Sequence, residues 1–228
     1  MRVCSTKPVD AGAGVGEGSG TASRCFPGVD VDQPIRIIVI MPVFEDRASC
    51  LPVLAELGAL PELQVRVVLV DDGSVREPMQ VDDLRRARVA GELLRLCRNV
   101  GHQRALAIGL AHALQNGPVD VPLVLMDSDG EDRPEAVAEL IERLVGGDGR
   151  EGCDVVVAAR GLRFEGLAFQ LFYQAYRIVF KVLTGKSIRF GNFMALTPAA
   201  AHRLLVMREL RTHVAAAVLA SRLRISAC

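Results

Sequence analysis

The sequence VPLVLMDSDGEDRPEAVAELIERLV at residues 121–145 contains an apolar run, an acidic turn and an amphipathic segment in succession. An apolar run with almost no polar residue is typical of a strand that is buried on both faces of a parallel sheet. Proline is favoured in the first turn of a helix, and Pro134 stands at that point. Behind it, apolar residues recur at helical spacing, namely Val137, Leu140, Ile141 and Leu144. The stretch therefore predicts a strand, a turn and a helix that packs on a sheet.

The same alternation continues on both sides of this stretch. Further apolar runs are IRIIVIM (35–41), QVRVVLV (64–70), ELLRLC (92–97) and DVVVAA (154–159). Segments with helical spacing separate them, at residues 51–60, 81–89 and 104–116. Parallel strands need crossover connections, which helices usually provide. The sequence therefore predicts an α/β protein with a mostly parallel, doubly wound sheet that is flanked by helices.

Length and composition predict one domain with an extension. The chain has 228 residues, of which 50% are hydrophobic and 24% charged, and this composition excludes a wholly disordered or collagen-like protein. Residues 1–33 are rich in Gly, Ser and Ala and show no periodicity. We predict that residues 1–33 form a disordered arm and that residues 34–228 form the domain. The six cysteines have no metal-ligand spacing, which favours reduced thiols in a cytosolic chain.

The charge of the chain is balanced overall but uneven along its length. There are 27 Lys and Arg residues against 27 Asp and Glu, which argues against nucleic acid as a partner. Residues 160–228, however, hold eleven Lys or Arg and only two acids. Residues 167–183 predict a mostly apolar helix with a basic pair, Arg177 and Lys181. Such a helix either packs in the core or rests on an anionic membrane.

The sequence contains no export signal and no run of about 18 apolar residues, so we predict a cytoplasmic location. If the helix predicted at residues 167–183 rests on an anionic membrane, the protein is peripheral on the cytoplasmic face of that membrane.

Polar residues follow each predicted strand, and ligands of open α/β sheets bind at this edge. Asp127 and Asp129 stand two residues apart directly after a predicted strand. Two carboxylates together with phosphate oxygens are a common way to hold Mg²⁺ or Mn²⁺. The alternative is that they form only a capped turn before the helix. DDGS at 71–74 has the same ambiguity, since its carboxylates could cap the turn or accept a nucleobase N–H.

The segment RNVGHQR at residues 98–104 places a glycine and Arg104 at the start of a predicted helix, which suits an anion. His102 in the same segment is interpreted as a solvated or capping residue. The glycine-rich fingerprints of dinucleotide oxidoreductases and P-loop nucleotidases are absent.

Four segments taken together resemble one family. They are VIMPVFED (39–46), VVLVDDGS (67–74), RNVGHQRALAIGLAHA (98–113) and VLMDSDGEDRPE (124–135). Their order and spacing are similar to those of the family 2 inverting glycosyltransferases, which have the GT-A fold. Within that family the pattern is most similar to the dolichyl- or undecaprenyl-phosphate sugar transferases. The likeness extends from about residue 35 to residue 205, and relatives usually continue further, so the domain is expected to be a shortened form or to lack their later loop.

The resemblance implies roles for individual residues. Pro42, Phe44 and Asp46 correspond to the segment that wraps the nucleobase and ribose, with Glu45 where relatives have Asn. Val70 and Asp72 correspond to the residues beside the base, and Asn99, Gly101 and Arg104 to the opening of the next helix. Asp127, Ser128 and Asp129 correspond to the metal-binding D-x-D motif, and Glu131 to a further metal ligand. Arg160 and Arg163 correspond to arginines that contact the sugar diphosphate or the acceptor phosphate, with Arg160 and Asp129 in catalytic roles.

The resemblance also implies a reaction. A sugar would move with inversion from a nucleoside-diphosphate sugar to an acceptor, most simply a polyprenyl phosphate, with Mg²⁺ or Mn²⁺ as cofactor. Asn192 stands where relatives commonly have Asp, and an amide cannot act as a base. A phosphate acceptor is already ionised and needs none. The alternatives are a glycosyltransferase for a soluble saccharide and a non-catalytic glycosyltransferase-like binding module.

Overall fold

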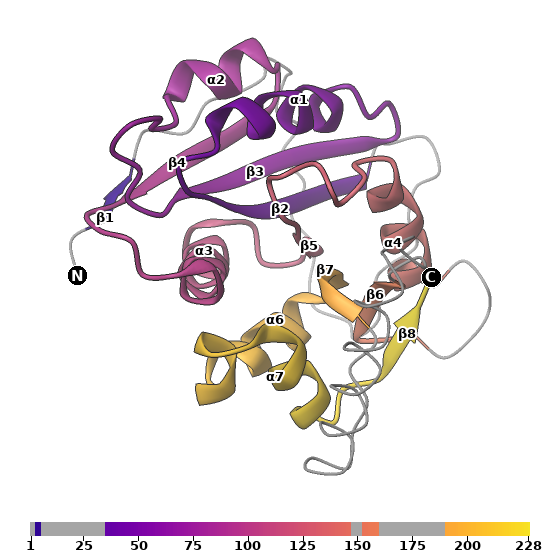
Figure 1. The fold of residues 1–228 in the computed structure, drawn as a ribbon. Coiled ribbons are helices and arrows are strands. Elements are labelled where there is room, and N and C mark those ends of the chain that lie inside the picture. Colours follow the sequence, from indigo (N-terminus) through magenta and orange to yellow (C-terminus); the bar gives the residue numbers. More distant parts are fainter. Residues whose placement is uncertain (1–2, 6–34, 147–151, 160–189) are drawn as a thin grey trace, which may run out of the picture.

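A computed structural model describes residues 3–5, 35–146, 152–159 and 190–228. In this part of the chain, eight strands form one sheet in the order β1-β4-β3-β2-β5-β7-β6-β8 (Figure 1). The strands are β1 (Val3–Ser5), β2 (Ile35–Val43), β3 (Leu63–Asp71), β4 (Ala90–Leu96), β5 (Leu123–Leu125), β6 (Val155–Ala159), β7 (Phe190–Leu196) and β8 (Ile225–Ala227). Strands β4, β3, β2 and β5 are parallel to one another, whereas β1 and β7 are antiparallel to their neighbours. The predicted mostly parallel α/β sheet is confirmed.

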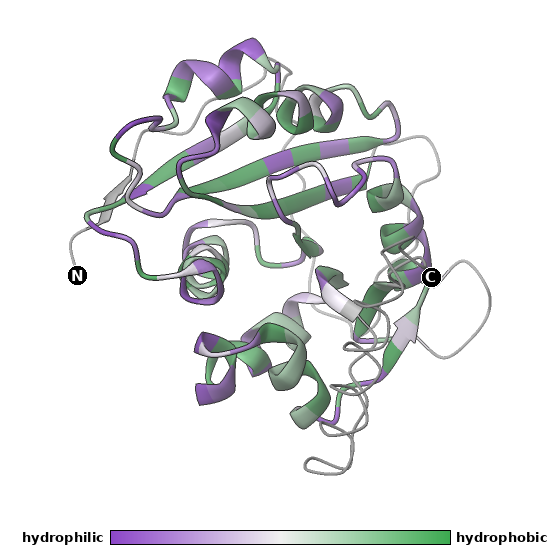
Figure 2. Ribbon diagram, in the orientation of Figure 1, coloured by the Kyte–Doolittle hydropathy of each residue, from purple (hydrophilic) through white to green (hydrophobic). Residues whose placement is uncertain are grey.

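Helices cover both faces of the sheet (Figure 1). They are α1 (Arg47–Gly58), α2 (Val81–Arg86), α3 (His102–Asn116), α4 (Ala136–Val145), α6 (Pro198–Leu205), α7 (Val214–Ala220) and the 3₁₀ turn η1 (Arg208–Arg211). One apolar core lies between the sheet and α1, α2 and α4, and a second lies between the sheet and α3, α6 and α7. The central strands β2 and β3 are hydrophobic along most of their length in Figure 2, because most of their residues are buried on both faces.

The units predicted from the sequence are found with small shifts at their ends. The helix predicted behind Pro134 is α4, and its four apolar residues are all buried. The segment predicted to be helical at 104–116 begins two residues earlier, at His102, because Gly101 adopts a positive φ of 92° that ends the preceding loop. Helix formation on both sides of a parallel sheet thus follows directly from the alternating sequence pattern.

The predicted disordered arm at residues 1–33 needs a correction. Residues Val3–Ser5 form β1, which pairs antiparallel with β4 at the edge of the sheet. A strand of three residues is too short to show a sequence pattern. Its partner β4 is about 90 positions away, so the unpaired backbone N–H and C=O groups of β4 that bind β1 become apparent only in the folded sheet. The other residues of the arm lie outside the described part of the chain, and for them disorder stays a prediction.

Several predictions fall on residues that the structure does not describe. The apolar helix predicted at 167–183 and the arginines Arg160 and Arg163 lie in the range 160–189, outside the described residues. Within the described ranges, none of the helices combines the length and the apolar character that crossing a membrane would require.

Candidate active site

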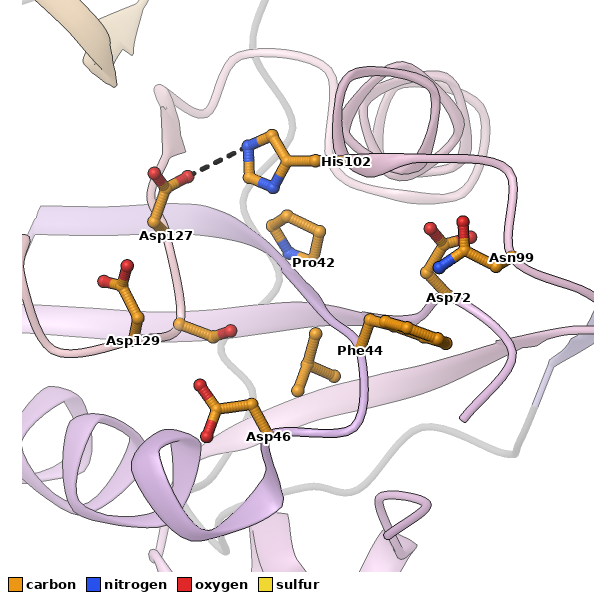
Figure 3. Close-up of a pocket in the computed structure, with 10 residues that line it drawn as sticks. Pro42, Phe44, Asp46, Asp72, Asn99, His102, Asp127 and Asp129 are labelled. Atoms are coloured by element: carbon orange, nitrogen blue, oxygen red, sulfur yellow. Dashed lines mark ion pairs between the residues drawn. The ribbon is translucent and has the colours of Figure 1, made fainter. Parts of the chain in front are cut away.

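A pocket of about 270 Å³ opens at the carboxyl ends of the parallel strands (Figure 3). Its lining residues come from the ends of β2, β3 and β5 and from the start of α3, namely Pro42, Val43, Phe44, Asp46, Asp72, Asn99, His102, Asp127, Ser128 and Asp129. In Figure 3, Asp46, Asp127 and Asp129 lie on one side, and Phe44, Asp72 and Asn99 lie on the other. Parallel strands bring their carboxyl ends to one edge, which explains why four distant segments meet here.

The loop after β2 presents an aromatic ring to the pocket. Phe44 is 48% exposed although it is large and apolar. The next residue, Glu45, has a positive φ of 51°, a conformation that non-glycine residues seldom adopt. Its carboxylate accepts backbone N–H groups of Val75, Arg76 and Glu77, and these bonds lower the pKa of Glu45, that from Val75 most. Glu45 therefore ties the β2 loop to the loop that follows β3 and turns Phe44 toward the pocket.

The two carboxylates after β3 are both bound to backbone N–H groups. Asp71 is fully buried and accepts from Ser74 and Met79 at 2.8 and 3.0 Å. Asp72 is 2% exposed and accepts from Val100 and Gly101 at 2.8 and 2.9 Å. Burial raises the pKa of Asp72, and the two backbone bonds act against that rise. Asp71 thus closes the turn, whereas Asp72 fixes the loop before α3 and still lines the pocket.

The turn at Asp71 also needs its glycine. Gly73 has a φ of 79°, and a Cβ at this position would lie 2.5 Å from the carbonyl carbon of Arg98. Any side chain would therefore push apart the β3 loop and the loop that leads into α3.

The acidic turn after β5 is arranged differently. Asp129 is exposed, and its Oδ1 accepts the N–H of Glu131 at 2.9 Å, as in a capped turn. Asp127 Oδ1, by contrast, is buried and has no hydrogen-bond partner among the described residues. A buried carboxylate oxygen without a donor is costly, which marks it as a site for an external cation or donor.

His102 lies close to that oxygen. Its Nε2 is 3.1 Å from Asp127 Oδ1 and 3.0 Å from Asn192 Nδ2 (Figure 3 shows the first contact). The side-chain contact with Asp127 is the largest cause that raises the pKa of His102, and burial acts in the opposite sense. The two side chains are thus within ion-pair distance, although Asp127 Oδ1 has no hydrogen-bond partner in the described part of the chain.

Most residues predicted for the site meet in the pocket. Those that line it are Pro42, Phe44, Asp46, Asp72, Asn99, Asp127, Ser128 and Asp129. Their roles in binding are not tested by this placement and stay predictions. Arg160 and Arg163 lie outside the described residues.

Three predicted site residues are placed elsewhere. Val70 is fully buried in the core, because side chains alternate along β3 and this one points between the sheet and α3. Arg104 is exposed on α3 and does not line the pocket, since it lies half a turn away from His102. Glu131 is exposed beyond the turn and is also absent from the pocket lining. None of the three lines this pocket, and their roles in binding substrate or metal stay predictions.

His102 lines the pocket beside Asp127, although its sequence context predicts only a solvated or capping residue. Its partner Asn192 is 90 positions away, so no local pattern shows the contact. The signal that was available is its place at the start of a helix after a strand, next to a positive-φ glycine.

The described residues fit a divalent cation that is shared with a phosphate ligand. Asp127 and Asp129 follow one strand, and Asp127 Oδ1 has no hydrogen-bond partner among the residues that the structure describes. In the described ranges no group of three or more His, Cys, Asp or Glu is arranged to hold a metal ion by itself. Mg²⁺ sites at nucleotides commonly use one or two carboxylates and complete their shell with phosphate oxygens and water. The site therefore suits a cation that arrives with a diphosphate.

Comparison with known proteins agrees with this geometry. The model of the family "Glycosyl transferase family 2" matches residues 38–208. An uncharacterized glycosyltransferase of Synechocystis sp. is 27% identical over 133 residues, which are 57% of this chain and 39% of that protein. The chain thus spans well under two thirds of this relative's length.

Solved structures show the same fold. A mannosyltransferase of Pyrobaculum calidifontis, solved with GDP-Man and Mn²⁺, has a TM-score of 0.57 at 16% identity and covers 91% of this chain and 58% of its own. Glucosyl-3-phosphoglycerate synthase of Mycobacterium tuberculosis, solved with Mn²⁺, UDP-glucose and phosphoglyceric acid, has a TM-score of 0.54 at 15% identity and covers 90% and 75%. At these identities the likeness concerns the fold, which is of the GT-A type. Since the family model matches well over half of the sequence, the chain belongs to glycosyl transferase family 2.

Proposed function

We propose that the protein transfers a sugar, with inversion, from a nucleoside-diphosphate sugar to a polyprenyl phosphate, and that it uses Mg²⁺ or Mn²⁺. The nucleotide-sugar and cation part of the proposal is carried by Asp127 Oδ1, a buried oxygen that has no hydrogen-bond partner among the described residues and belongs to a residue that lines the pocket at the strand ends. The two solved structures named above contain Mn²⁺ and a nucleotide sugar, which supports the same ligand class for this pocket.

The two sides of the pocket suit two parts of the donor. Phe44 offers a half-exposed ring on which a nucleobase stacks, and Asp72 lies on the same side (Figure 3). Each oxygen of Asp72 already accepts one backbone N–H and keeps a second lone pair for a base N–H. Asp127 and Asp129 on the opposite side would hold the cation next to the diphosphate.

Catalysis in this account is positioning and charge compensation. When bound, Mg²⁺ or Mn²⁺ neutralises negative charge on the departing diphosphate. Asp127 and Asp129 fix where that compensation acts, while Phe44 and Asp72 fix the nucleoside, so that the anomeric carbon faces the acceptor. Arg160 and Arg163, outside the described residues, are proposed to offset the charge of the acceptor phosphate.

Two features support a phosphate as the acceptor, namely the side chain of Asn192 and the exposed basic residues of α6 and η1. Asn192 Oδ1 accepts from Gln103, and its Nδ2 faces His102, so this position supplies no base. An ionised phosphate acceptor needs none. Basic side chains are exposed on α6 and η1, at Arg203, Arg208 and Arg211. A surface of this kind supports an anionic acceptor and reversible attachment to anionic lipid, at about 1 kcal/mol per basic residue.

Transfer assays test the proposal. Purified protein would be incubated with UDP- or GDP-sugars and Mn²⁺, with polyprenyl phosphate in vesicles or with soluble saccharides, and ¹H NMR would give the anomeric configuration of the product. We expect an inverted sugar phosphate that forms only with the cation. A product from saccharides alone would replace the acceptor in this proposal.

A non-catalytic binding module is the second candidate, favoured by the absence of a carboxylate at position 192. Nucleotide-sugar binding without transfer or hydrolysis under any of these conditions would favour it over a transferase.

A further inference from the structure

The short strand β1 binds one end of its neighbour β4. Val3 pairs with Leu96 and Ser5 pairs with Leu94, so β1 covers the last three residues of β4. Among the described strands, only β1 lies beyond β4 on this side of the sheet (Figure 1). Without β1, the outer N–H and C=O groups at the end of β4 would face solvent, and β4 would be an open edge strand.

The backbone that leaves β4 forms part of the pocket. Asn99, shortly after the end of β4, lines the pocket on the same side as Phe44 and Asp72 (Figure 3). The N–H groups of Val100 and Gly101 bind the carboxylate of Asp72 at 2.8 and 2.9 Å. The position of this backbone therefore decides where Asn99 and Asp72 stand.

Burial contributes little to holding this backbone in place. On its inner side, the backbone of Arg98 lies against Gly73 of the β3 loop. The side chains of Cys97, Arg98 and Asn99 are all exposed, whereas Leu94 and Leu96 at the end of β4 are buried. Segments with few buried side chains open at a low free energy. A strand on the outer edge of β4 therefore restrains the segment at the point where it leaves the sheet.

The connection to β2 does not keep β1 in its place. The 29 residues 6–34 join β1 to β2, and a chain of this length reaches at most about 100 Å. β1 lies three strand positions from β2, which is about 14 Å at the usual spacing of strands. Because the connection is far longer than this span, the docked position of β1 depends on its pairing with β4.

We infer that β1 is a positioning strand for the Phe44 side of the pocket. When β1 pairs with β4, it fixes the backbone of residues 97–101 and with it Asp72 and Asn99. That this side holds the nucleoside rests on the proposed function. The effect on the backbone rests only on the pairing of β1 with β4 and on the two hydrogen bonds to Asp72.

Docking of β1 and binding of nucleotide should favour each other. If docked β1 raises the affinity for nucleotide by some factor, bound nucleotide favours docked β1 by the same factor. UDP or GDP with Mn²⁺ should therefore slow amide hydrogen exchange at Leu94–Leu96 in the wild type, and unchanged exchange there on saturation would contradict this coupling. Asp127 and Asp129 follow β5, which β3 and β2 separate from β4, so the cation side should not respond to β1.

Two prolines in β1 test the pairing without shortening the chain. In an antiparallel strand the N–H groups of alternate residues face the partner, so Cys4→Pro combined with Ser5→Pro removes a paired N–H whichever of the two faces β4. Ala11→Pro combined with Gly12→Pro is the matched control, because it places the same two prolines in the connection to β2. Urea unfolding would verify that both double variants are folded.

The effect on the backbone is read by hydrogen exchange without ligand. We expect faster exchange at Leu94–Leu96, Val100 and Gly101 in the Cys4→Pro, Ser5→Pro variant, with β2 unchanged and the control variant like wild type. Unchanged exchange at Val100 and Gly101 would overturn the inference. Faster exchange throughout the sheet, or a variant that does not fold, would also overturn it, since β1 would then support the whole fold.

The effect on the nucleoside is read by calorimetric titration with Mn²⁺ present, using UDP or GDP and, separately, pyrophosphate, which has no nucleoside. We expect the Cys4→Pro, Ser5→Pro variant to bind nucleotide about tenfold more weakly, as it would if the fixed backbone were populated about a tenth of the time. Its affinity for pyrophosphate should equal that of wild type. Unchanged nucleotide affinity, or equal weakening for both ligands, would overturn this part.

The two measurements separate this inference from the proposed function. A wild type that binds neither UDP nor GDP would overturn the proposed function and the nucleoside part together. Hydrogen exchange at Val100 and Gly101 needs no ligand, so it would still decide whether β1 fixes the backbone of residues 97–101.

Discussion

The two acidic turns of the pocket edge, after β3 and after β5, look alike in sequence and differ in their hydrogen bonds. Asp71 and Asp72 each accept two backbone N–H groups. Asp127 Oδ1 has no hydrogen-bond partner in the described part of the chain, and Asp129 accepts one N–H at an exposed position. Both turns contain a glycine of positive φ, so turn geometry alone does not separate them.

Backbone hydrogen bonds distinguish carboxylates that support the fold from carboxylates that are available to a ligand. Donors from the backbone compensate a buried carboxylate and make its removal costly for stability. A carboxylate oxygen that the protein leaves without a donor contributes little to the fold and keeps its charge for a ligand. Substituting one turn should therefore change stability, and substituting the other should change binding and turnover.

The largest effect is expected from Asp127→Asn. The amide keeps the size of the side chain but removes the charge that would hold the cation. Sugar transfer should fall by at least about a hundredfold, since loss of an outer partner of a metal ligand already costs 10–100-fold. The free energy of unfolding should change little. Steady-state assays and urea unfolding on the same preparation measure both, and a variant with wild-type turnover would assign the β5 turn to the fold.

Asp71→Asn should produce the opposite pattern. One of the two backbone N–H groups bound by this carboxylate, at Ser74 or Met79, would lose its acceptor inside the protein. An unsatisfied buried donor costs about 2 kcal/mol, which urea unfolding would detect as a lower midpoint. The affinity of the folded variant for Mn²⁺ and nucleotide should stay within about threefold of wild type, which corresponds to a change in binding free energy of about 0.7 kcal/mol. Equal stability to wild type would remove the basis of the comparison.

A third carboxylate, Asp83, extends the comparison to pH. Arg47 donates two hydrogen bonds to it, and this side-chain contact is the largest cause that lowers the pKa of Asp83. A lowered folded pKa stabilises the protein above the ordinary Asp value of about 4, and the contribution disappears as pH falls through the folded pKa. Asp83→Asn should therefore be less stable than wild type at neutral pH and converge with it in acid. Urea unfolding across pH tests this, and a gap that widens in acid would contradict the sign.

The smallest effect is expected from Glu45→Gln. Glu45 joins the β2 loop to the backbone of residues 75–77 through its carboxylate, and the amide has only one oxygen to accept these N–H groups. Amide hydrogen exchange at Val75, Arg76 and Glu77 should become faster, while exchange in β2 and β3 stays unchanged. Exchange that accelerates throughout the sheet would show that Glu45 supports the whole fold rather than one loop.

Much of the fold was predictable because its signals are local. Buried strands such as β3 appear as apolar runs, and α4 shows its buried face through helical spacing. The pocket followed from the rule that strand ends meet at one edge, which brought Asp72 and Asp127 together. Position along the chain does not report which way a side chain points, and so the burial of Val70 in the core was not predicted. Contacts between distant segments, such as His102 with Asn192 or β1 with β4, have no local signal.

Thermal stabilisation by nucleotide tests the central claim, that the Asp127 carboxylate of the β5 turn holds a cation together with a nucleoside diphosphate. Wild type and Asp127→Asn would be melted with UDP or GDP, each with and without Mn²⁺. A ligand at 100 times its Kd adds about 2.7 kcal/mol to the folded state. The account predicts a rise in Tm for wild type that needs both nucleotide and Mn²⁺, and loss of the Mn²⁺-dependent part in Asp127→Asn. The same Mn²⁺-dependent rise in both proteins would contradict it.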